Sequence, residues 1–192
     1  MDRKTRKILC MNGKLHPRSN VSRLYLKRRD GGRGLISVED CVEGERKGLN
    51  EYVTASKEDM LVCVKDEGIL NEMESRGAFK KRVKLERMED WKTKSLHGQF
   101  FRDTEGIADD RSLDWIRSGF LKPETEGMIF AVQEQALRTR AIRAHIDKQS
   151  VSPMCRMCGG KTETAMHLAS ACPKMAQKEY LTRHDKVAAR VH

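Results

Sequence analysis

Three cysteines and one histidine near the C-terminus have the spacing of a metal site. They form the pattern C-x2-C-x8-H-x4-C with Cys155, Cys158, His167 and Cys172. Zn²⁺ prefers thiolate and imidazole ligands, and four of them complete a tetrahedral shell that leaves no position for a water nucleophile. The spacing therefore predicts a structural zinc ion, Zn(2+), whose binding is coupled to the folding of this segment.

The residues between the ligands fit such a site. Gly159 and Gly160 let the backbone fold back so that amide N–H groups reach the thiolates. A short helix is expected to carry His167. Because five residues on an α-helix rotate by about 140°, Cys172 must lie where that helix ends, just before Pro173. The alternative interpretation is a chance clustering of the four side chains.

A second kind of chemistry is indicated by positive charge at the N-terminus. Residues 1–36 contain eleven lysine and arginine residues against two aspartates, whereas the whole chain carries a formal net charge of +10. Such a block is what binding to a phosphate backbone requires, and the alternative is a solvated arm. A glycine-rich stretch at 27–36 lets the backbone approach a phosphate closely, although it lacks Walker-loop spacing. The nucleic-acid contacts predicted in it are Lys27, Arg28, Arg29 and Arg33.

The segment Gly106–Asp110 contains paired acids that suggest a polymerase-like metal site. Two-metal catalysis needs a further carboxylate on a neighbouring strand. The residues after Asp110 have a helical pattern instead, and no second apolar strand follows. A residual enzyme that uses Asp109 and Asp110 is therefore the least favoured hypothesis.

The composition indicates a mainly α-helical protein of elongated helices with a thin core, or a piece of a larger protein whose core lies elsewhere. Only 38% of the residues are hydrophobic and 5% aromatic, whereas 34% are charged. The N-terminus does not resemble a signal peptide, and no apolar stretch approaches the ~20 residues of a membrane span. We expect a soluble protein inside the cell, in the nucleus or cytoplasm, with reduced thiols, no membrane partner and no small-molecule substrate. The oligomeric state stays open.

Periodicity predicts the elements that position these residues. Helices are expected over residues 1–12, from 38 to about 52, from 56 onward, over 73–101, over 124–147 and over 174–191, with a short strand at 21–26. We expect a basic arm with a thumb-like helical segment at 1–70, a helical linker subdomain at 71–150, and a zinc knuckle with a C-terminal helix at 151–192.

Several motifs together resemble one protein family. The ligand pattern, with Glu163-Thr164 before the histidine and Tyr180-x-x-Arg183-His184-Asp185 after the last cysteine, resembles the CCHC zinc knuckle of non-LTR (LINE-like) retrotransposon polyproteins. The similarity is greatest to the group that carries a restriction-like endonuclease. Two upstream stretches, 31–40 and 121–137, are similar as well.

This resemblance implies the thumb and linker of a reverse transcriptase, followed by the knuckle. It implies RNA and DNA as partners, and Arg183 and His184 as further nucleic-acid contacts. The polymerase palm and the endonuclease would then lie outside residues 1–192, so the chain itself is not expected to be an enzyme. The alternative is a zinc-stapled helical protein-interaction module that does not bind nucleic acid.

Overall fold

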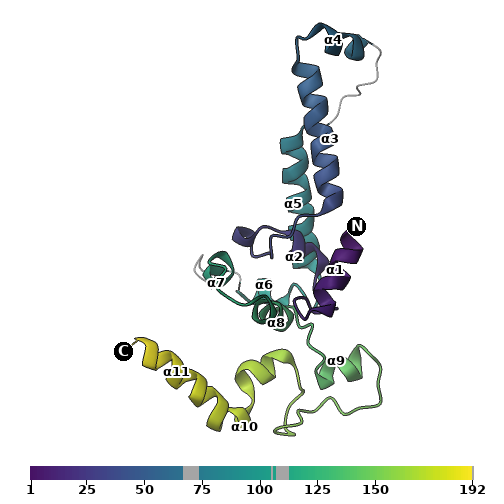
Figure 1. Ribbon diagram of the computed structural model, residues 1–192. Helices are drawn as coiled ribbons and strands as arrows, with labels where there is room; N and C mark the ends of the chain where they lie inside the picture. The colour runs from purple at the N-terminus through teal and green to yellow at the C-terminus, as the bar shows by residue number, and fades with distance from the viewer. Residues whose placement is uncertain (67–73, 105, 107–112, 192) are drawn as a thin grey trace.

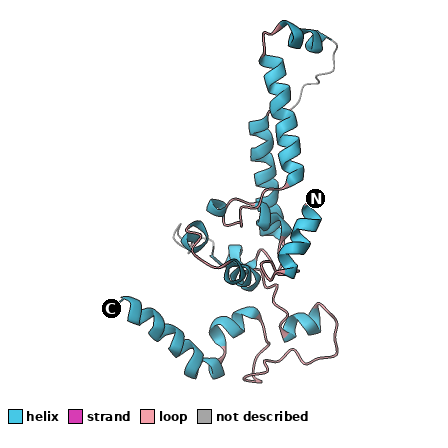
Figure 2. Ribbon diagram, viewed as in Figure 1, coloured by secondary structure: helices cyan, strands magenta, loops and turns pink. Residues whose placement is uncertain are grey.

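The computed structural model describes residues 1–66, 74–104, 106 and 113–191, and in these ranges it contains helices and no β-strand. Figure 1 shows a long helical hairpin at one end, short helices in the middle and a C-terminal part at the other end. Helices joined by loops make up the drawn chain (Figure 2). The predicted mainly α-helical fold is confirmed, and the elongated shape agrees with the scarcity of apolar residues.

The N-terminal segment begins with α1 (Asp2–Met11) and α2 (Val21–Tyr25). The strand predicted at residues 21–26 is wrong. The side chain of Asn20 accepts a hydrogen bond from the backbone N–H of Arg23 and starts a short helix. The alternating pattern did not predict the burial of Arg23, which the structure shows.

Arg23 is a fully buried side chain. Its Cζ atom is 4.3 Å from the ring centroid of Trp91 and 4.2 Å from that of Phe130. Its Nη1 lies 3.6 Å from the buried carboxylate of Glu134, and its Nε donates to the carbonyl oxygen of Gly31. Burial lowers the pKa of Arg23 to about 10 despite the opposing charge of Glu134. This cation of the basic block therefore lies in the core rather than on the surface.

The hairpin consists of α3 (Val38–Ala55) and α5 (Arg76–Thr93), which contact each other, with α4 (Asp59–Asp66) near its tip. The start of α3 was predicted correctly, since Ser37 caps it by accepting from the N–H of Asp40. Phe79 is the buried side chain between the helices, opposite Gly44. Ion pairs from Arg76 to Glu45 and from Arg87 to Asp40 add to this thin apolar contact.

The long helix predicted over residues 73–101 is divided. It ends at Thr93, and α6 (Gln99–Thr104) follows. The turn between them closes tightly at Gly98, where a Cβ atom would lie 2.2 Å from the carbonyl oxygen of Lys92. Arg102 then donates to the carbonyl oxygens of Lys92, Lys94 and Ser95, at and just after the end of α5.

The helix predicted over residues 124–147 is also divided. A short helix, α7 (Asp114–Arg117), precedes α8 (Pro123–Gln133), and α9 (Arg140–His145) comes next. Gln135 has φ 53°, a left-handed conformation that ends α8. Thr139 starts α9 by accepting from the N–H of Ile142. None of the helices in the described ranges is long and apolar enough to cross a membrane.

The C-terminal part contains two π-helical turns, η3 (His167–Ala171) and η4 (Ala176–Tyr180), separated by the short helix α10 (Pro173–Met175). The last helix, α11 (Leu181–Val191), follows directly. Another helical turn, η1 (Arg28–Asp30), lies in the loop between α2 and α3. Residues 174–191 are thus helical as predicted, but with a π-helical turn in place of one regular helix.

Candidate metal centre

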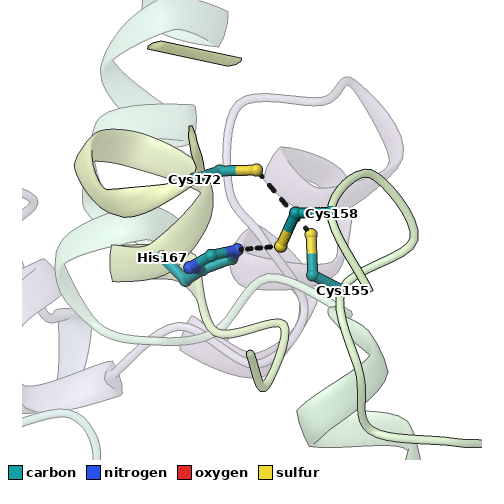
Figure 3. Close-up of side chains that lie close together, drawn as sticks. All are labelled: Cys155, Cys158, His167 and Cys172. Atoms are coloured by element: carbon teal, nitrogen blue, oxygen red, sulfur yellow. Dashed lines mark hydrogen bonds between the residues drawn. The ribbon is translucent and has the colours of Figure 1, made fainter. Parts of the chain in front are cut away.

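The four predicted ligands lie together. The Sγ atoms of Cys155, Cys158 and Cys172 and the ring nitrogen of His167 all lie within 4.8 Å of one another. The sulfurs of Cys155 and Cys172 are 4.0 Å apart, and Nε2 of His167 is 3.4 Å from the sulfur of Cys158 (Figure 3). Tetrahedral Zn²⁺ with Zn–S bonds of about 2.3 Å places its sulfurs about 3.8 Å apart. The cluster is therefore compatible with a structural metal ion such as zinc.

A tight turn holds the first two ligands. The N–H of Gly159, which has φ 66°, donates to the carbonyl oxygen of Cys155 at 2.8 Å. The N–H of Cys155 donates to the carbonyl oxygen of Lys161 at 2.7 Å, and Met154 and Thr162 form an isolated antiparallel bridge. This fold-back directs both cysteine side chains to the same side, as the glycines at 159 and 160 suggested.

The π-helical turn η3 positions the other two ligands. In a π-helix each hydrogen bond joins residues five apart, so a residue and the fifth one after it lie on the same side. His167 and Cys172 have this separation, and Cys172 ends the turn directly before Pro173. The sequence predicted the end of the helix at Cys172 correctly. The wider turn removes the 140° offset that a regular α-helix would impose.

The thiols differ in their tendency to ionise. Burial raises the pKa of Cys155, but the amides of Cys158 and Met157 outweigh it, and the net shift is downward. The N–H of Gly160 is the main cause that lowers the pKa of Cys158. Burial raises the pKa of Cys172. Two of the three thiols are therefore predisposed to the thiolate form that binds a metal.

Glu163 joins this turn to the preceding helix. Its buried carboxylate accepts from the backbone N–H and the guanidinium of Arg156, and from the backbone N–H of Arg140 in the first turn of α9. The hydrogen bonds from Arg156 are the main reason why the pKa of Glu163 falls to about 2. Glu163 therefore connects the metal-ligand turn to the body of the protein.

Tyr180 supports the ligand turn from the other side. Its hydroxyl accepts a hydrogen bond from the N–H of Cys172 at 3.2 Å, and it lies 3.1 Å from the carbonyl oxygen of Leu168. Arg183 packs on the ring of Tyr180 and donates to the carbonyl oxygen of Ala169 at 3.0 Å. Arg183 thus has a structural contact as well as its predicted nucleic-acid role. The sequence pointed to Tyr180 through the motif after the last cysteine, but not to this supporting role.

His184 lies on the exposed part of α11. Its side chain is 77% exposed, and its Nδ1 is 3.2 Å from the carboxylate of Asp185. It is not among the four residues that the structure brings together as a ligand cluster. His184 is therefore accessible to a partner, and its predicted nucleic-acid contact stays a prediction.

The four cations predicted at residues 27–33 divide into two pairs. Arg28 and Arg33 reach the buried carboxylate of Glu126, at 2.9 and 3.0 Å. Lys27 and Arg29 are exposed, and their side chains have no ion-pair partner within the described ranges. The predicted phosphate contacts are therefore more accessible at Lys27 and Arg29 than at the two arginines that hold Glu126.

The acids proposed for residual catalysis, Asp109 and Asp110, lie outside the described residues.

Comparison with known proteins found no matching family model, no matching curated protein and no matching solved structure.

Proposed function

We propose that this protein binds nucleic acid and that a structural zinc ion stabilises its C-terminal part. The observation that carries the proposal is the Cys155, Cys158, His167 and Cys172 cluster, in which all ligand atoms lie within 4.8 Å. Zn²⁺ bound there would have a complete shell of protein ligands, so its role would be structural rather than catalytic. The net charge of +10 supports nucleic acid as the partner.

The resemblance to the thumb, linker and zinc knuckle of a non-LTR retrotransposon reverse transcriptase supports the same proposal. In this account RNA, DNA or both are the ligands, and the chain carries out no reaction itself. Incubation with a primed template and Mg²⁺ is expected to give no extension, either for the wild type or for Asp109→Ala. Extension by the wild type that Asp109→Ala abolishes would contradict this part of the proposal.

The main test is a salt titration of nucleic-acid binding. Labelled single-stranded RNA and DNA are titrated with zinc-loaded protein, and the affinity is expected to fall steeply between low and moderate salt because released counterions drive binding. Cys155→Ser is expected to lose the metal and bind more weakly. Cys41→Ser, which changes an exposed free cysteine, is the matched control. Binding that is independent of salt, or unchanged in Cys155→Ser, would contradict the proposal.

A protein-interaction module is the second candidate. Four large hydrophobic side chains on α3 are exposed, Val42 and Leu49 by 64% each, Tyr52 by 57% and Val38 by 38%. A partner helix could cover them. This function is favoured if the protein requires metal for folding and binds neither RNA nor DNA in the same titration.

A further inference from the structure

A groove lies at the base of the helical hairpin. It has a volume of about 640 Å³ and is lined by α3, by α5 and by the loop that joins α2 to α3. Figure 1 shows that loop crossing the base of the hairpin, in the half of the molecule away from the C-terminal helices. The groove is therefore separate from the metal centre.

Positive charge predominates along this groove. Its three acids are all paired with cations that also line it: Asp30 with Lys84, Asp40 with Arg87, and Glu45 with Arg76. Four further lining cations are exposed and have no ion-pair partner in the part of the chain that the structure describes. They are Lys27, Arg29, Lys80 and Lys81.

The lysines and the glutamates of α5 lie on different faces of the helix. In the sequence, lysines and glutamates alternate along this helix, which favours a solvated surface. In the structure Lys80 and Lys81 line the groove, whereas Glu86 and Glu89 do not. Glu86 instead pairs with Arg82 at 2.8 Å, and Arg82 also binds Glu74. The acids of α5 therefore do not neutralise the groove.

Apolar side chains lie among these cations. Leu35, Ile36, Phe79 and Val83 also line the groove, and Ile36 is 76% exposed. A cationic groove with apolar surface suits a nucleic-acid strand, whose phosphates bind lysine and arginine while sugars and bases contact apolar atoms.

We propose that this groove binds the sugar–phosphate backbone of a nucleic-acid strand, with Lys80 and Lys81 of α5 acting together with Lys27 and Arg29 of the loop. The inference rests on the proposed function and assigns a site to it. It adds two residues that the sequence favoured as a solvated face. Recognition is independent of base sequence, because these lysine and arginine side chains would meet phosphates rather than base edges.

The test compares two double variants of equal charge. Lys80→Gln with Lys81→Gln removes two groove cations, and Lys57→Gln with Lys148→Gln removes two exposed cations that do not line the groove. Circular dichroism should show that both variants fold like the wild type, since all four side chains are exposed. Fluorescence anisotropy then measures the affinity for labelled RNA and DNA over a range of salt concentrations.

The groove variant is expected to bind roughly tenfold more weakly, with a salt slope reduced by about two, because two phosphate contacts are lost. The control is expected to stay close to the wild type. Equal weakening in both variants, or none in the groove variant, would overturn the inference while leaving the proposed function intact. If the wild type itself binds no nucleic acid, the proposed function fails as well.

Discussion

The residues that hold the metal ligands in place are as informative as the ligands themselves. Glu163 is fully buried, and its carboxylate accepts hydrogen bonds from the backbone N–H and the guanidinium of Arg156, which lies in the turn between Cys155 and Cys158. The same carboxylate accepts a hydrogen bond from the backbone N–H of Arg140 at the start of α9. A single carboxylate therefore couples the metal centre to the helical body.

Replacing this carboxylate should reveal the coupling through pH. Glu163→Gln is expected to destabilise the protein at neutral pH by about 3 kcal/mol, because the pKa of Glu163 falls from 4.5 to about 2 on folding. A depressed pKa contributes stability above pH 4.5, and this contribution is lost as the pH falls toward 2. Urea unfolding of both proteins with equal metal content measures the difference. A difference that stays constant from pH 7 to pH 3 would rule out the carboxylate as its source.

Tyr180 offers a second test at this scale. Tyr180→Phe removes the hydroxyl that accepts from the N–H of Cys172, and changes in such supporting contacts typically reduce metal affinity about 10–100-fold. Competition with a zinc chelator measures the affinity. Tyr52→Phe, at an exposed tyrosine of α3, is the control and should leave it unchanged. Equal affinities in all three proteins would show that Tyr180 does not support the site.

The ligands were predictable from sequence, but their supports were not. Residue type and spacing identify the four ligands, Cys155, Cys158, His167 and Cys172. The roles of Glu163 and Tyr180 depend on hydrogen bonds to backbone groups, which no spacing rule encodes. Arg23 is the opposite case, since its residue type suggested surface charge and only its three-dimensional surroundings show a buried contact with Trp91.

At the scale of elements, the sequence predicted helices better than the breaks between them. The capped start at Ser37 agrees with the structure, and the helix predicted from residue 124 begins at Pro123. The breaks near Gly98 and Gln135 were missed because apolar residues continue at helical steps through both. Both breaks depend on local backbone conformation and on hydrogen bonds between neighbouring residues, which the periodicity of apolar residues does not contain.

Gly98 provides a test of the first break. Gly98→Ala is expected to destabilise the protein by more than about 2 kcal/mol, because the added Cβ would lie 2.2 Å from the carbonyl oxygen of Lys92. Gly77→Ala, within α5, meets no atom closer than 3.9 Å and should stabilise by up to about 1 kcal/mol. Thermal unfolding distinguishes the two. Similar effects from both substitutions would contradict the tight turn.

At the scale of the whole molecule, buried charge joins segments distant in sequence. Glu134, after α8, holds Arg23 and accepts from the N–H of Asn20, while Glu126 holds Arg28 and Arg33. The basic N-terminal block is thus partly neutralised inside the fold. A charge count along the sequence could not separate these arginines from the exposed cations of the groove.

Removing one partner of the central pair should affect the whole molecule. Glu134→Ala leaves Arg23 buried without its carboxylate, which typically costs about 3–5 kcal/mol. Glu89→Ala, at an exposed position of α5, should change stability by less than about 0.5 kcal/mol. Urea unfolding monitored by tryptophan fluorescence is suitable, because Trp91 packs against Arg23. Equal unfolding midpoints for the two variants would contradict a central role for the pair.

The most direct test of the account is the absorption spectrum of the protein after Co²⁺ replaces zinc. Three thiolates and one imidazole around a tetrahedral ion predict intense visible d–d bands and a thiolate-to-metal charge-transfer band, with one metal ion per chain. Cys172→Ser should weaken the charge-transfer band, and Cys63→Ser, at an exposed free cysteine, should leave it unchanged. A pale octahedral spectrum without charge transfer, or no bound metal, would contradict the metal centre.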